Sequence, residues 1–592
     1  MDNKIESILN SVQKPARYIG KEWNSVRKAW DQDYFRFLLA FPDIYEIGMS
    51  HLGIKILYGL LNERKDLLCE RVFAPWPDME QALRAEHVKL FSLESKEPID
   101  AFDIIGFSLT YELSYTNVLT IMDLGGIPVR SNERDETHPL ILAGGPCSVN
   151  PEPMADFIDA FVIGDGEEVI LEVVDTCKRF SCAAENRRKG SSRRWSDHSA
   201  LLEGLAKIEG VYVPSLVAVE YRTDGSVRSF SPKNGTRFPV KKRIVHDLDA
   251  AYYPTRQIVP YIQVVHDRIS LEIMRGCKNF CKFCQATATY SPQRERSLEK
   301  ILELAKESYM NTGYEEIALV SLSSGDHSRI LEIIRSLNDE FRDKAVSISF
   351  PSLRIEENVS ELPNLISLVK KTGLTFAPEC GSDRLRRSLN KNIRIDALLS
   401  AAREAYKAGW KRIKLYFMIG LPTENDEDLL AIIDLIEAVS LSKRKVNGSP
   451  ALVTASISPF VPKPHTPFQR TAMASLEELK RKKSFLISHL SKRRLRSKLD
   501  FHDFSMSFLE GVFSRGDRRL SRVIAKAWEK GAKFDSWREF FKIDCWLESF
   551  EALGIRPEDY IYANRDAADL LPWDCIDVGL QKETSRVSKT AI

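Results

Sequence analysis

Three cysteines stand close together near the middle of the chain. Cys277, Cys281 and Cys284 follow CxxxCxxC spacing within the stretch RGCKNFCKFCQA. Thiolates are soft ligands that suit iron–sulfur clusters or zinc. Three thiolates on one loop would hold three irons of a cubane [4Fe–4S] cluster and leave the fourth iron open. A zinc knuckle and three buried cysteines are the alternatives, but a zinc site needs a fourth ligand, and the loop contains none. The spacing therefore favours the cluster.

The segment before the cysteines predicts where this loop lies. RISLEIM, at residues 268–274, is short, apolar and partly β-branched, which is typical of a buried strand. Gly276 follows and ends the strand. We therefore expect the cysteines on a loop at the carboxyl end of a strand, where parallel α/β folds build their sites.

The cysteine spacing, with Phe283 directly before Cys284, resembles the signature of the radical SAM superfamily. The resemblance implies that the open iron binds the amino and carboxylate groups of S-adenosylmethionine (SAM). It also implies that one electron from the cluster cleaves the sulfonium and generates a 5′-deoxyadenosyl radical. An electron donor such as flavodoxin or ferredoxin is then expected as a partner.

Composition indicates an ordinary globular protein of several domains. The chain has 592 residues, 43% of them hydrophobic and 28% charged, which is too long for one core. The net charge of +2 gives no overall field that would favour nucleic acid or membrane as partner. There is no apolar run of membrane-spanning length, and MDNKIESILN has no signal-peptide pattern. The scattered cysteines outside the cluster loop suit a reducing compartment, so we expect a cytoplasmic protein.

Changes of pattern along the chain predict an α/β protein of five parts. These are a helical lead-in (1–33), a doubly wound Rossmann-like domain (34–180), a linker with a small β bridge (181–260), a radical SAM core (261–470), and a basic helix with a mainly helical C-terminal region (471–592).

The second part alternates strands and helices, which predicts a doubly wound parallel sheet. Its strands are YFRFLLAF, DIIGFSLT, PLILAGG and DAFVIG. Glycines at strand ends let a bulky or phosphate-bearing ligand approach the backbone closely. The expected ligand edge carries Ser108, Thr110, Gly144, Gly145, Gly164 and Gly166.

GFSLTYELSYTNVL and LILAGGPCSVNPEPMADFIDAFVIGDGEE resemble the cobalamin-binding domain of cobalamin-dependent radical SAM proteins. The resemblance implies cobalamin as a third cofactor. The DxHxxG motif that supplies a histidine to cobalt in mutases is absent. His51, in MSHLGIK, is interpreted as a residue at the start of a helix, so cobalamin is expected without a protein histidine on cobalt. The alternative is a Rossmann-like domain that binds nothing.

Six strand–helix units are expected in the core, which predicts a (β/α)6 partial barrel. By resemblance, Ser323, Ser324 and Gly325 occupy the place of the segment that binds the methionyl amine. Glu379 occupies the place of the ribose-binding residue, although a carboxylate near a helix N-terminus is the alternative. Gly420, within MIGLPTE, resembles the adenine-binding strip. Asp326, Ser352 and Arg354 also follow predicted strands.

Three later features have two interpretations each. His465, in a proline-rich loop at 459–470, is either a substrate contact or a hydrogen-bonded loop histidine. The basic stretch at 475–498 is either an RNA contact or, as we favour, a solvated helix face. Asp517, Arg518 and Arg519 either bind an anion or pair with each other and with neighbouring residues.

The leading functional hypothesis is SAM-dependent methylation of an unactivated carbon through cobalamin. The first alternative is a radical rearrangement or sulfur insertion without methyl transfer. The second is an RNA-associated modification or maturation factor, in which the basic helix is the contact. Nothing in the residues identifies the substrate.

Overall fold

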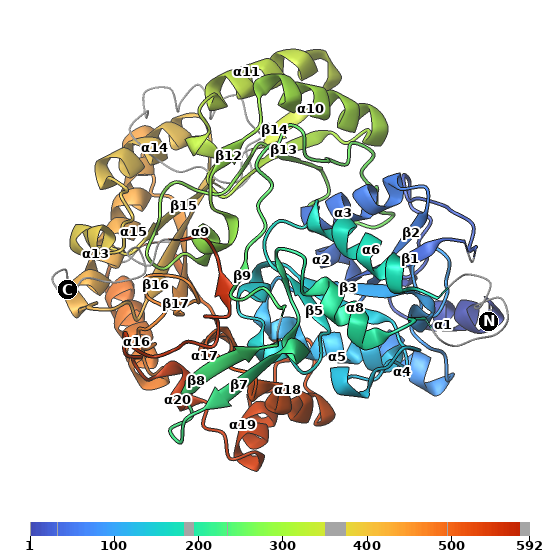
Figure 1. Cartoon of the computed structure of the whole chain (residues 1–592). Helices are drawn as coiled ribbons and strands as arrows, with labels where there is room; N and C mark the ends of the chain where they lie inside the picture. Colours follow the sequence, from blue (N-terminus) through green and yellow to red (C-terminus); the bar gives the residue numbers. More distant parts are fainter. Residues whose placement is uncertain are drawn as a thin grey trace.

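The structure is a computed structural model that describes residues 2–31, 33–182, 194–233, 235–349, 374–493, 495 and 497–580. Two α/β units lie beside each other, and helices from the C-terminal part of the chain pack against both (Figure 1). The expected fold class is confirmed. Among the described residues, no helix is both long enough and apolar enough to span a membrane.

The N-terminal unit is a six-stranded sheet in which only the last strand, β6, is antiparallel. The order reverses at β1, which lies between β2 and β3, and this is the switch point where doubly wound sheets bind ligands. In spatial order the strands are β2 (Leu67–Phe73), β1 (Phe35–Phe41), β3 (Ile104–Ser108), β4 (Leu140–Gly144), β5 (Ala160–Val162) and β6 (Val211–Tyr212).

Side chains alternate across this sheet and bury both of its faces. In β1, Phe37 and Leu39 pack on one face, whereas Leu38 and Ala40 pack on the other. The first face is covered by α3 (Leu52–Glu63), α6 (Val169–Phe180) and α8 (His198–Leu205). The second face is covered by α4 (Pro77–Ala85) and α5 (Tyr115–Leu124).

Strand β2 was not predicted, because LLCERVF has two charged residues at its centre. Both are buried and paired. Arg71 lies 2.8 Å from Glu22 and 2.7 Å from Glu94. Glu70 accepts a 2.7 Å hydrogen bond from the Ser95 hydroxyl. Partners far along the chain therefore make a charged segment compatible with a buried strand.

Two predicted segments differ from expectation. The lead-in is helical only at α1 (Asp2–Ser11) and in a short 3-10 turn, η1 (Pro15–Arg17). The predicted surface linker at 181–200 contains Trp195, which is fully buried, and the first turn of α8. Its residues 183–193 lie outside the described residues.

All six strands predicted for the core are present, in two parallel sheets that curve along the inside of their helices (Figure 1). The first sheet has β10 (Ile269–Glu272), β13 (Glu316–Val320) and β14 (Ser347–Ser349). The second has β15 (Leu374–Glu379), β16 (Arg412–Ile419), β17 (Leu452–Pro459) and an unpredicted strand, β18 (Lys498–Phe501). The main helices are α10 (Leu298–Thr312), α11 (Ile330–Phe341), α14 (Ile395–Lys407), α15 (Asp426–Asn447) and α16 (Leu476–Lys492). Ser352 and Arg354 lie outside the described residues, as does the helix expected near residues 361–370.

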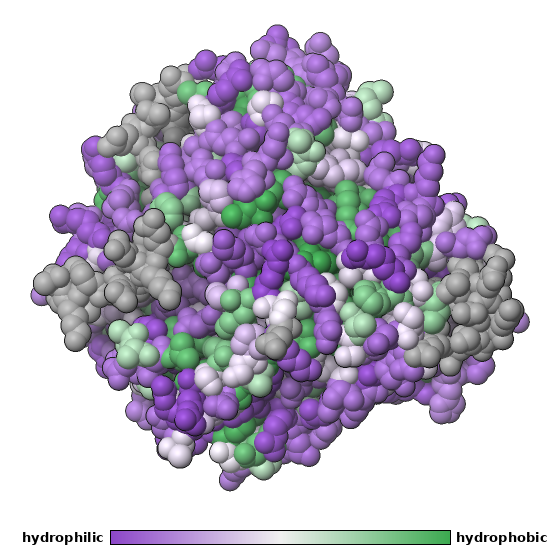
Figure 2. All heavy atoms as spheres, viewed as in Figure 1, coloured by the Kyte–Doolittle hydropathy of each residue, from purple (hydrophilic) through white to green (hydrophobic). Residues whose placement is uncertain are grey.

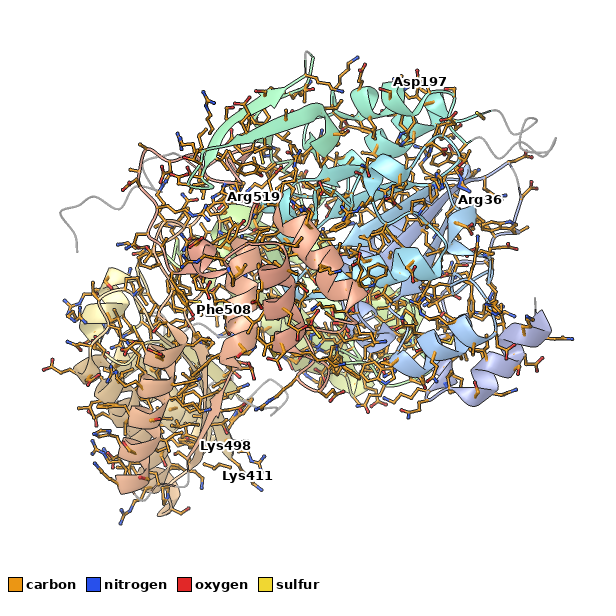
Figure 3. All side chains as sticks on the ribbon, turned by 90° about the horizontal axis from the view of Figure 1, so that it is seen from below. Arg36, Asp197, Lys411, Lys498, Phe508 and Arg519 are labelled. Atoms are coloured by element: carbon orange, nitrogen blue, oxygen red, sulfur yellow. The ribbon has the colours of Figure 1, made fainter. Side chains whose placement is uncertain are left out.

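Short strands connect the units to the end of the chain. The small β bridge predicted within 181–260 contains a hairpin of β7 (Val217–Tyr221) and β8 (Val227–Pro232), with Gly225 at a φ of 83° in its turn. Strand β9 (Val240–Lys241) pairs in parallel with β19 (Ile576–Asp577). The C-terminal helices are α17 (Phe504–Ser514), α18 (Leu520–Glu529), α19 (Ile543–Ala552) and α20 (Glu558–Ile561). Figure 3 shows those that carry Phe508 and Arg519 lying between the two units.

Lys463 ties together three parts of the chain. Its ammonium lies 2.8 Å from Glu112 of the N-terminal unit and 2.8 Å from Glu510 of α17. It also donates to the Ser514 hydroxyl at 2.8 Å. Burial disfavours the charged form, but the two carboxylates outweigh this effect and raise the pKa of Lys463. The proline-rich loop at 459–470 is thereby fixed to both neighbours.

Removing the positive charge of Lys463 should weaken the contacts among the proline-rich loop, the N-terminal unit and α17. Lys463→Met leaves two buried carboxylates without their cation, and we expect a loss of about 3–5 kcal/mol in stability. The measurement is the thermal unfolding midpoint, together with the rate of proteolysis at the junction. Lys492→Met, at the exposed end of α16, is the control and should change stability by less than roughly 0.5 kcal/mol. Equal midpoints for the two variants would contradict the assigned role of Lys463.

Candidate active site

The cysteine loop begins directly after the short strand β11 (Met274–Arg275). Gly276 has a φ of 88°, and a Cβ there would lie 2.6 Å from the Pro292 carbonyl oxygen. Only glycine suits this turn. The loop is held from outside, because the Lys282 amide donates to the Leu389 carbonyl at 3.0 Å and the Asn390 side chain donates to the Asn279 carbonyl at 3.0 Å.

The three cysteines of this loop form no disulfide. Cys281 is buried, and Cys277 and Cys284 are half-buried. The Asn279 amide lies 3.3 Å from the Cys277 sulfur. Burial raises the pKa of Cys284, and negative charge on Cys277 and Glu379 raises it further. These groups are therefore close enough to interact, and a metal cluster between them would favour the thiolates.

The three thiols are compatible with a cubane cluster. Among the described residues, no three His, Cys, Asp or Glu side chains are grouped so as to hold one metal ion. In a cubane cluster each thiolate binds its own iron, so the sulfurs surround the cluster instead of meeting at one point.

The segment after β13 has an unused polar group. It forms a 3-10 turn, η8 (Ser324–Asp326), in which the Ser324 hydroxyl lies 2.8 Å from that of Ser321. The Ser323 hydroxyl is buried and has no hydrogen-bond partner among the described residues. A buried hydroxyl without a partner costs about 1–3 kcal/mol. A bound amine would satisfy it, as the resemblance implies for Ser323 to Gly325.

Glu379 ends β15 with a φ of 69°, beyond an irregularity in the strand. A glutamate held in this region is strained, which is typical of functional sites. Its carboxylate lies 3.1 Å from the Lys391 ammonium. The next helix, α13 (Asp383–Ser388), is capped by the Ser382 hydroxyl, so Glu379 does not cap that helix. A ribose would have to share this carboxylate with Lys391.

Gly420 follows β16 with a φ of 79°, and its amide donates to a Glu424 carboxylate oxygen at 2.7 Å. The Glu424 side chain is buried, and its carboxylate lies 2.5 Å from the Lys482 ammonium of α16. Within MIGLPTE, Glu424 therefore holds the turn by accepting the hydrogen bond from the Gly420 amide. Lys482 of α16 stabilises this turn through its ion pair with Glu424.

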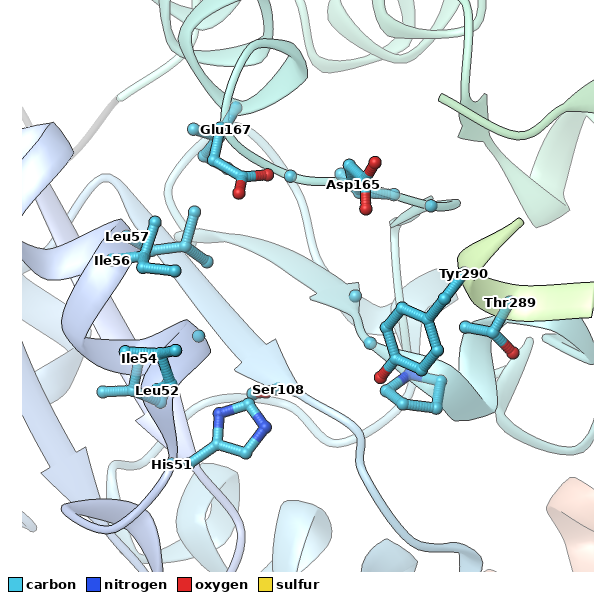
Figure 4. A pocket seen from close by; sticks show the side chains of 18 of the residues that line it. His51, Leu52, Ile54, Ile56, Leu57, Ser108, Asp165, Glu167, Thr289 and Tyr290 are labelled. Atoms are coloured by element: carbon cyan, nitrogen blue, oxygen red, sulfur yellow. The ribbon is translucent and has the colours of Figure 1, made fainter. Parts of the chain in front are cut away.

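A cavity of about 390 Å³ lies between the two units, and residues of both line it (Figure 4). Five of the six predicted edge residues line it, namely Ser108, Gly144, Gly145, Gly164 and Gly166. Thr110 does not. The core contributes both flanks of the cysteine loop and the end of β13, namely Arg275, Gly276, Thr289, Tyr290, Val320, Ser321 and Leu322. The cavity therefore joins the carboxyl edges of two parallel sheets.

The edge glycines serve two purposes. Gly145 and Gly164 have φ values of 105° and 98°, and a Cβ would lie 2.7 Å and 2.2 Å from backbone oxygens. The fold itself requires these two. At Gly144 and Gly166 the nearest atoms to a Cβ would be 3.6 Å and 3.5 Å away, which are ordinary contacts. Packing does not require glycine there, so the missing side chains leave space in the cavity.

Charged residues that the sequence analysis missed join the units beside the cavity. Arg275, just before the cysteine loop, lies 3.1 Å from Asp165 and 2.6 Å from Glu167 of the N-terminal unit. Arg294 lies 2.5 Å from Asp165. Burial favours the neutral form of Asp165, but Arg275 and Arg294 outweigh it and lower the pKa of Asp165. The sequence RGC places Arg275 beside the cysteine loop, but no local pattern indicates that Asp165 and Glu167 are its partners.

His51 also lines the cavity, beside Ser108 in Figure 4. It stands at the start of α3, as predicted, but its side chain does not cap the helix. Burial lowers the pKa of His51 to about 4, so the ring is neutral at ordinary pH.

The remaining candidates form structural contacts instead of joining the cavity. His465 lies 2.9 Å from the Val149 carbonyl oxygen. Arg518 pairs with Glu152 at 3.0 Å, and Arg519 pairs with Asp517 at 2.7 Å. Arg481 of α16 pairs with Asp426 of α15, and Arg493, directly after α16, pairs with Asp434 of α15.

Two family models match the chain and together cover more than half of it. The model described as "Radical SAM proteins, N-terminal" matches residues 53–214, and that of the "Radical SAM superfamily" matches residues 271–436. The second match includes the cysteine loop and most of the core strands.

The chain belongs to the radical SAM superfamily. It is a radical SAM enzyme, and its cofactors accordingly include a [4Fe–4S] cluster and SAM. The cluster loop, the unpartnered Ser323 hydroxyl and the strained Glu379 are the features of this chain that fit those two groups.

Several known proteins are similar to this radical SAM enzyme. Protein MJ0966 of Methanocaldococcus jannaschii is 28% identical over 524 residues, which are 87% of this chain and 97% of that protein. A tRNA-2-methylthio-N(6)-dimethylallyladenosine synthase of Clostridioides difficile is 28% identical over 28% of this chain and 37% of its own length.

Among solved structures, the methyltransferase TsrM of Kitasatospora setae, with cobalamin and a [4Fe–4S] cluster bound, has 12% identity and a TM-score of 0.44. That match covers 72% of each chain. The cobalamin-dependent radical enzyme OxsB has 14% identity and a TM-score of 0.46, over 76% of this chain and 62% of its own. Both likenesses are weak.

Replacing Cys277, Cys281 and Cys284 together by alanine should abolish iron and sulfide binding, because three of the four irons lose their ligands. Iron analysis and visible absorption after anaerobic reconstitution measure this. Cys545→Ala, half-exposed in α19, is the control and should retain the full iron content. Wild-type protein that takes up zinc and no iron would refute the assignment.

Proposed function

We propose that this radical SAM enzyme methylates an unactivated carbon and uses cobalamin bound to its N-terminal unit. The observation that carries the proposal is the shared cavity. Its walls come from the glycine-bearing edge of the N-terminal sheet and from both flanks of the cysteine loop. Hydrogen abstraction alone would not need a second ligand-binding unit open to the same space.

The N-terminal edge has features that suit a corrinoid. It lies at the switch point of a doubly wound sheet, where ligands usually bind. Packing does not require glycine at Gly144 or Gly166, and the missing side chains leave the backbone accessible there. A flat macrocycle needs such an accessible backbone in order to approach closely. Ligand cavities usually measure roughly 300–1,000 Å³. At about 390 Å³ this one suits the reacting part of a large cofactor rather than all of it.

When bound, the cluster and SAM supply a 5′-deoxyadenosyl radical, and cobalamin supplies a carrier for the methyl group. The chain's own task is to hold substrate and cofactors together and exclude water. Leu52, Ile54 and Leu57 form an apolar wall on the N-terminal side. Such a wall strengthens every polar contact inside the cavity.

The core side supplies polar groups close to the cysteine loop. Thr289 and Tyr290 end α9 (Gln285–Tyr290), the helix that begins directly after Cys284, and both line the cavity. Burial raises the pKa of Tyr290, so its hydroxyl remains protonated and can donate a hydrogen bond to substrate. The ion pairs of Arg275 with Asp165 and Glu167 keep this side in register with the N-terminal edge.

A second candidate is sulfur insertion or rearrangement without methyl transfer. The similarity to tRNA methylthio synthases favours it, but the C. difficile match covers 28% of this chain. The basic residues of α16 give an RNA substrate little support, because Arg481 and Arg493 are paired with acidic residues of α15.

Adding a side chain at Gly166 should weaken cobalamin binding, and a larger side chain should weaken it more. Gly166→Ala adds a methyl group with ordinary contacts, whereas Gly166→Leu extends into the cavity. Overpacking costs about 1–3 kcal/mol, so we expect Leu to weaken affinity roughly ten- to hundredfold. Cobalamin per chain is measured by absorption after desalting, with iron content as the control. Equal retention by wild type and both variants would contradict cobalamin binding at this edge.

Methyl transfer itself is tested with reduced enzyme, methyl-labelled SAM and a cell extract separated into RNA, protein and small molecules. We expect label in one fraction, with both 5′-deoxyadenosine and S-adenosylhomocysteine formed. The triple cysteine variant is the control and should form no 5′-deoxyadenosine. Formation of 5′-deoxyadenosine alone, with no label transferred to a substrate that stimulates turnover, would favour the second candidate.

A further inference from the structure

His51 is placed at the switch point of the N-terminal sheet. It lies in the connection that follows β1, between α2 (Tyr45–Gly48) and α3, and it lines the cavity together with Ser108 at the end of β3. Figure 4 shows its ring beside Ser108, whereas Tyr290 enters from the core. The N-terminal unit therefore contributes His51 to the space proposed for cobalamin, whereas the cysteine loop belongs to the core.

The ring of His51 has no structural use within the described residues. It stands at the N-cap position of α3 but makes no capping hydrogen bond. Its Nδ1 atom is buried and has no hydrogen-bond partner. The ring packs against Phe41, with 5.5 Å between the two ring centroids and the planes tilted. A buried nitrogen left unpaired costs about 1–3 kcal/mol, so a ligand that binds it would recover this cost.

Two other histidines with little exposure show the usual arrangement. His327 has its Nε2 atom 3.1 Å from the Arg296 carbonyl oxygen, and His465 has its Nε2 atom 2.9 Å from that of Val149. Each ring is fixed by a backbone oxygen. His51 differs because its ring lines a cavity and its Nδ1 atom has no partner among the described residues. The ring is also neutral at ordinary pH, and a neutral imidazole is a strong ligand for metals.

We propose that a ring nitrogen of His51 is the protein ligand to cobalt in the bound corrinoid. This inference rests on the proposed function, because it requires cobalamin in the cavity. It revises the expectation from sequence that cobalt has no protein histidine. The DxHxxG motif is absent and α2 lies between β1 and His51, yet His51 lines the cavity together with Ser108 at the end of β3.

Electron paramagnetic resonance of the Co(II) form tests the inference directly. Wild-type protein is labelled with 15N-histidine, loaded anaerobically with unlabelled hydroxocobalamin and reduced. A 15N ligand splits each cobalt line into a doublet, whereas the 14N of the cofactor's own benzimidazole gives a triplet. We expect doublets in labelled wild type, triplets in unlabelled wild type, and loss of the protein-derived splitting in His51→Ala. Exogenous imidazole should restore nitrogen splitting in that variant.

Labelled His465→Gln is the matched control and should keep the doublet, because its ring already has a backbone partner. Triplets in the labelled wild type would show that the benzimidazole is the ligand and overturn the inference. Bound Co(II) without any nitrogen splitting would also overturn it, while cobalamin binding would stand. Failure of the wild type to retain cobalamin after desalting would refute the proposed function and, with it, this inference.

Discussion

The position of the cavity depends on the ion pairs around Arg275. This residue directly precedes the cysteine loop, and its guanidinium binds Asp165 and Glu167 from the other unit. Buried ion pairs add little net stability, because desolvation offsets their attraction. Their geometry is specific, however, and breaking one leaves a buried charge. The Arg275 contacts therefore set how the cysteine loop faces the N-terminal edge, while packing of the C-terminal helices supplies much of the cohesion.

Strand polarity explains why two independent units share one cavity. Parallel strands present all their carboxyl ends at one edge, and loops at that edge carry the functional groups. Gly144 ends β4 in the first unit, and Ser321 follows β13 in the second. Both residues line the cavity. In Figure 2, apolar residues show between hydrophilic ones over the middle and lower part of this face. Facing edges thus create a water-poor space that neither sheet could enclose alone.

Local patterns in the sequence predict most of this architecture. The alternation of Phe37 and Leu39 with Leu38 and Ala40 marks β1 as a strand buried on both faces. Strand β2 escaped prediction because its two charged residues have partners outside the strand: Arg71 is paired with Glu22, and Glu70 accepts a hydrogen bond from Ser95. Similarly, Arg275 and Glu167 are separated by 108 residues, and the pattern around each gives no sign of the other. Sequence reasoning succeeds for elements built from neighbours and fails for contacts between units.

The same distinction, between residues that are neighbours in sequence and residues brought together by the fold, separates the cysteine loop from His51. The cysteines lie within eight positions of one loop, so their spacing reports the geometry of the ligands directly. His51 belongs to a site assembled from several loops, and the short helix α2 separates it from β1 along the chain. Such a residue is identified by its position at a strand edge and by its unpaired nitrogen. A missing spacing motif is therefore weak grounds for excluding a ligand, whereas a buried polar atom without a partner is a physical reason to look for one.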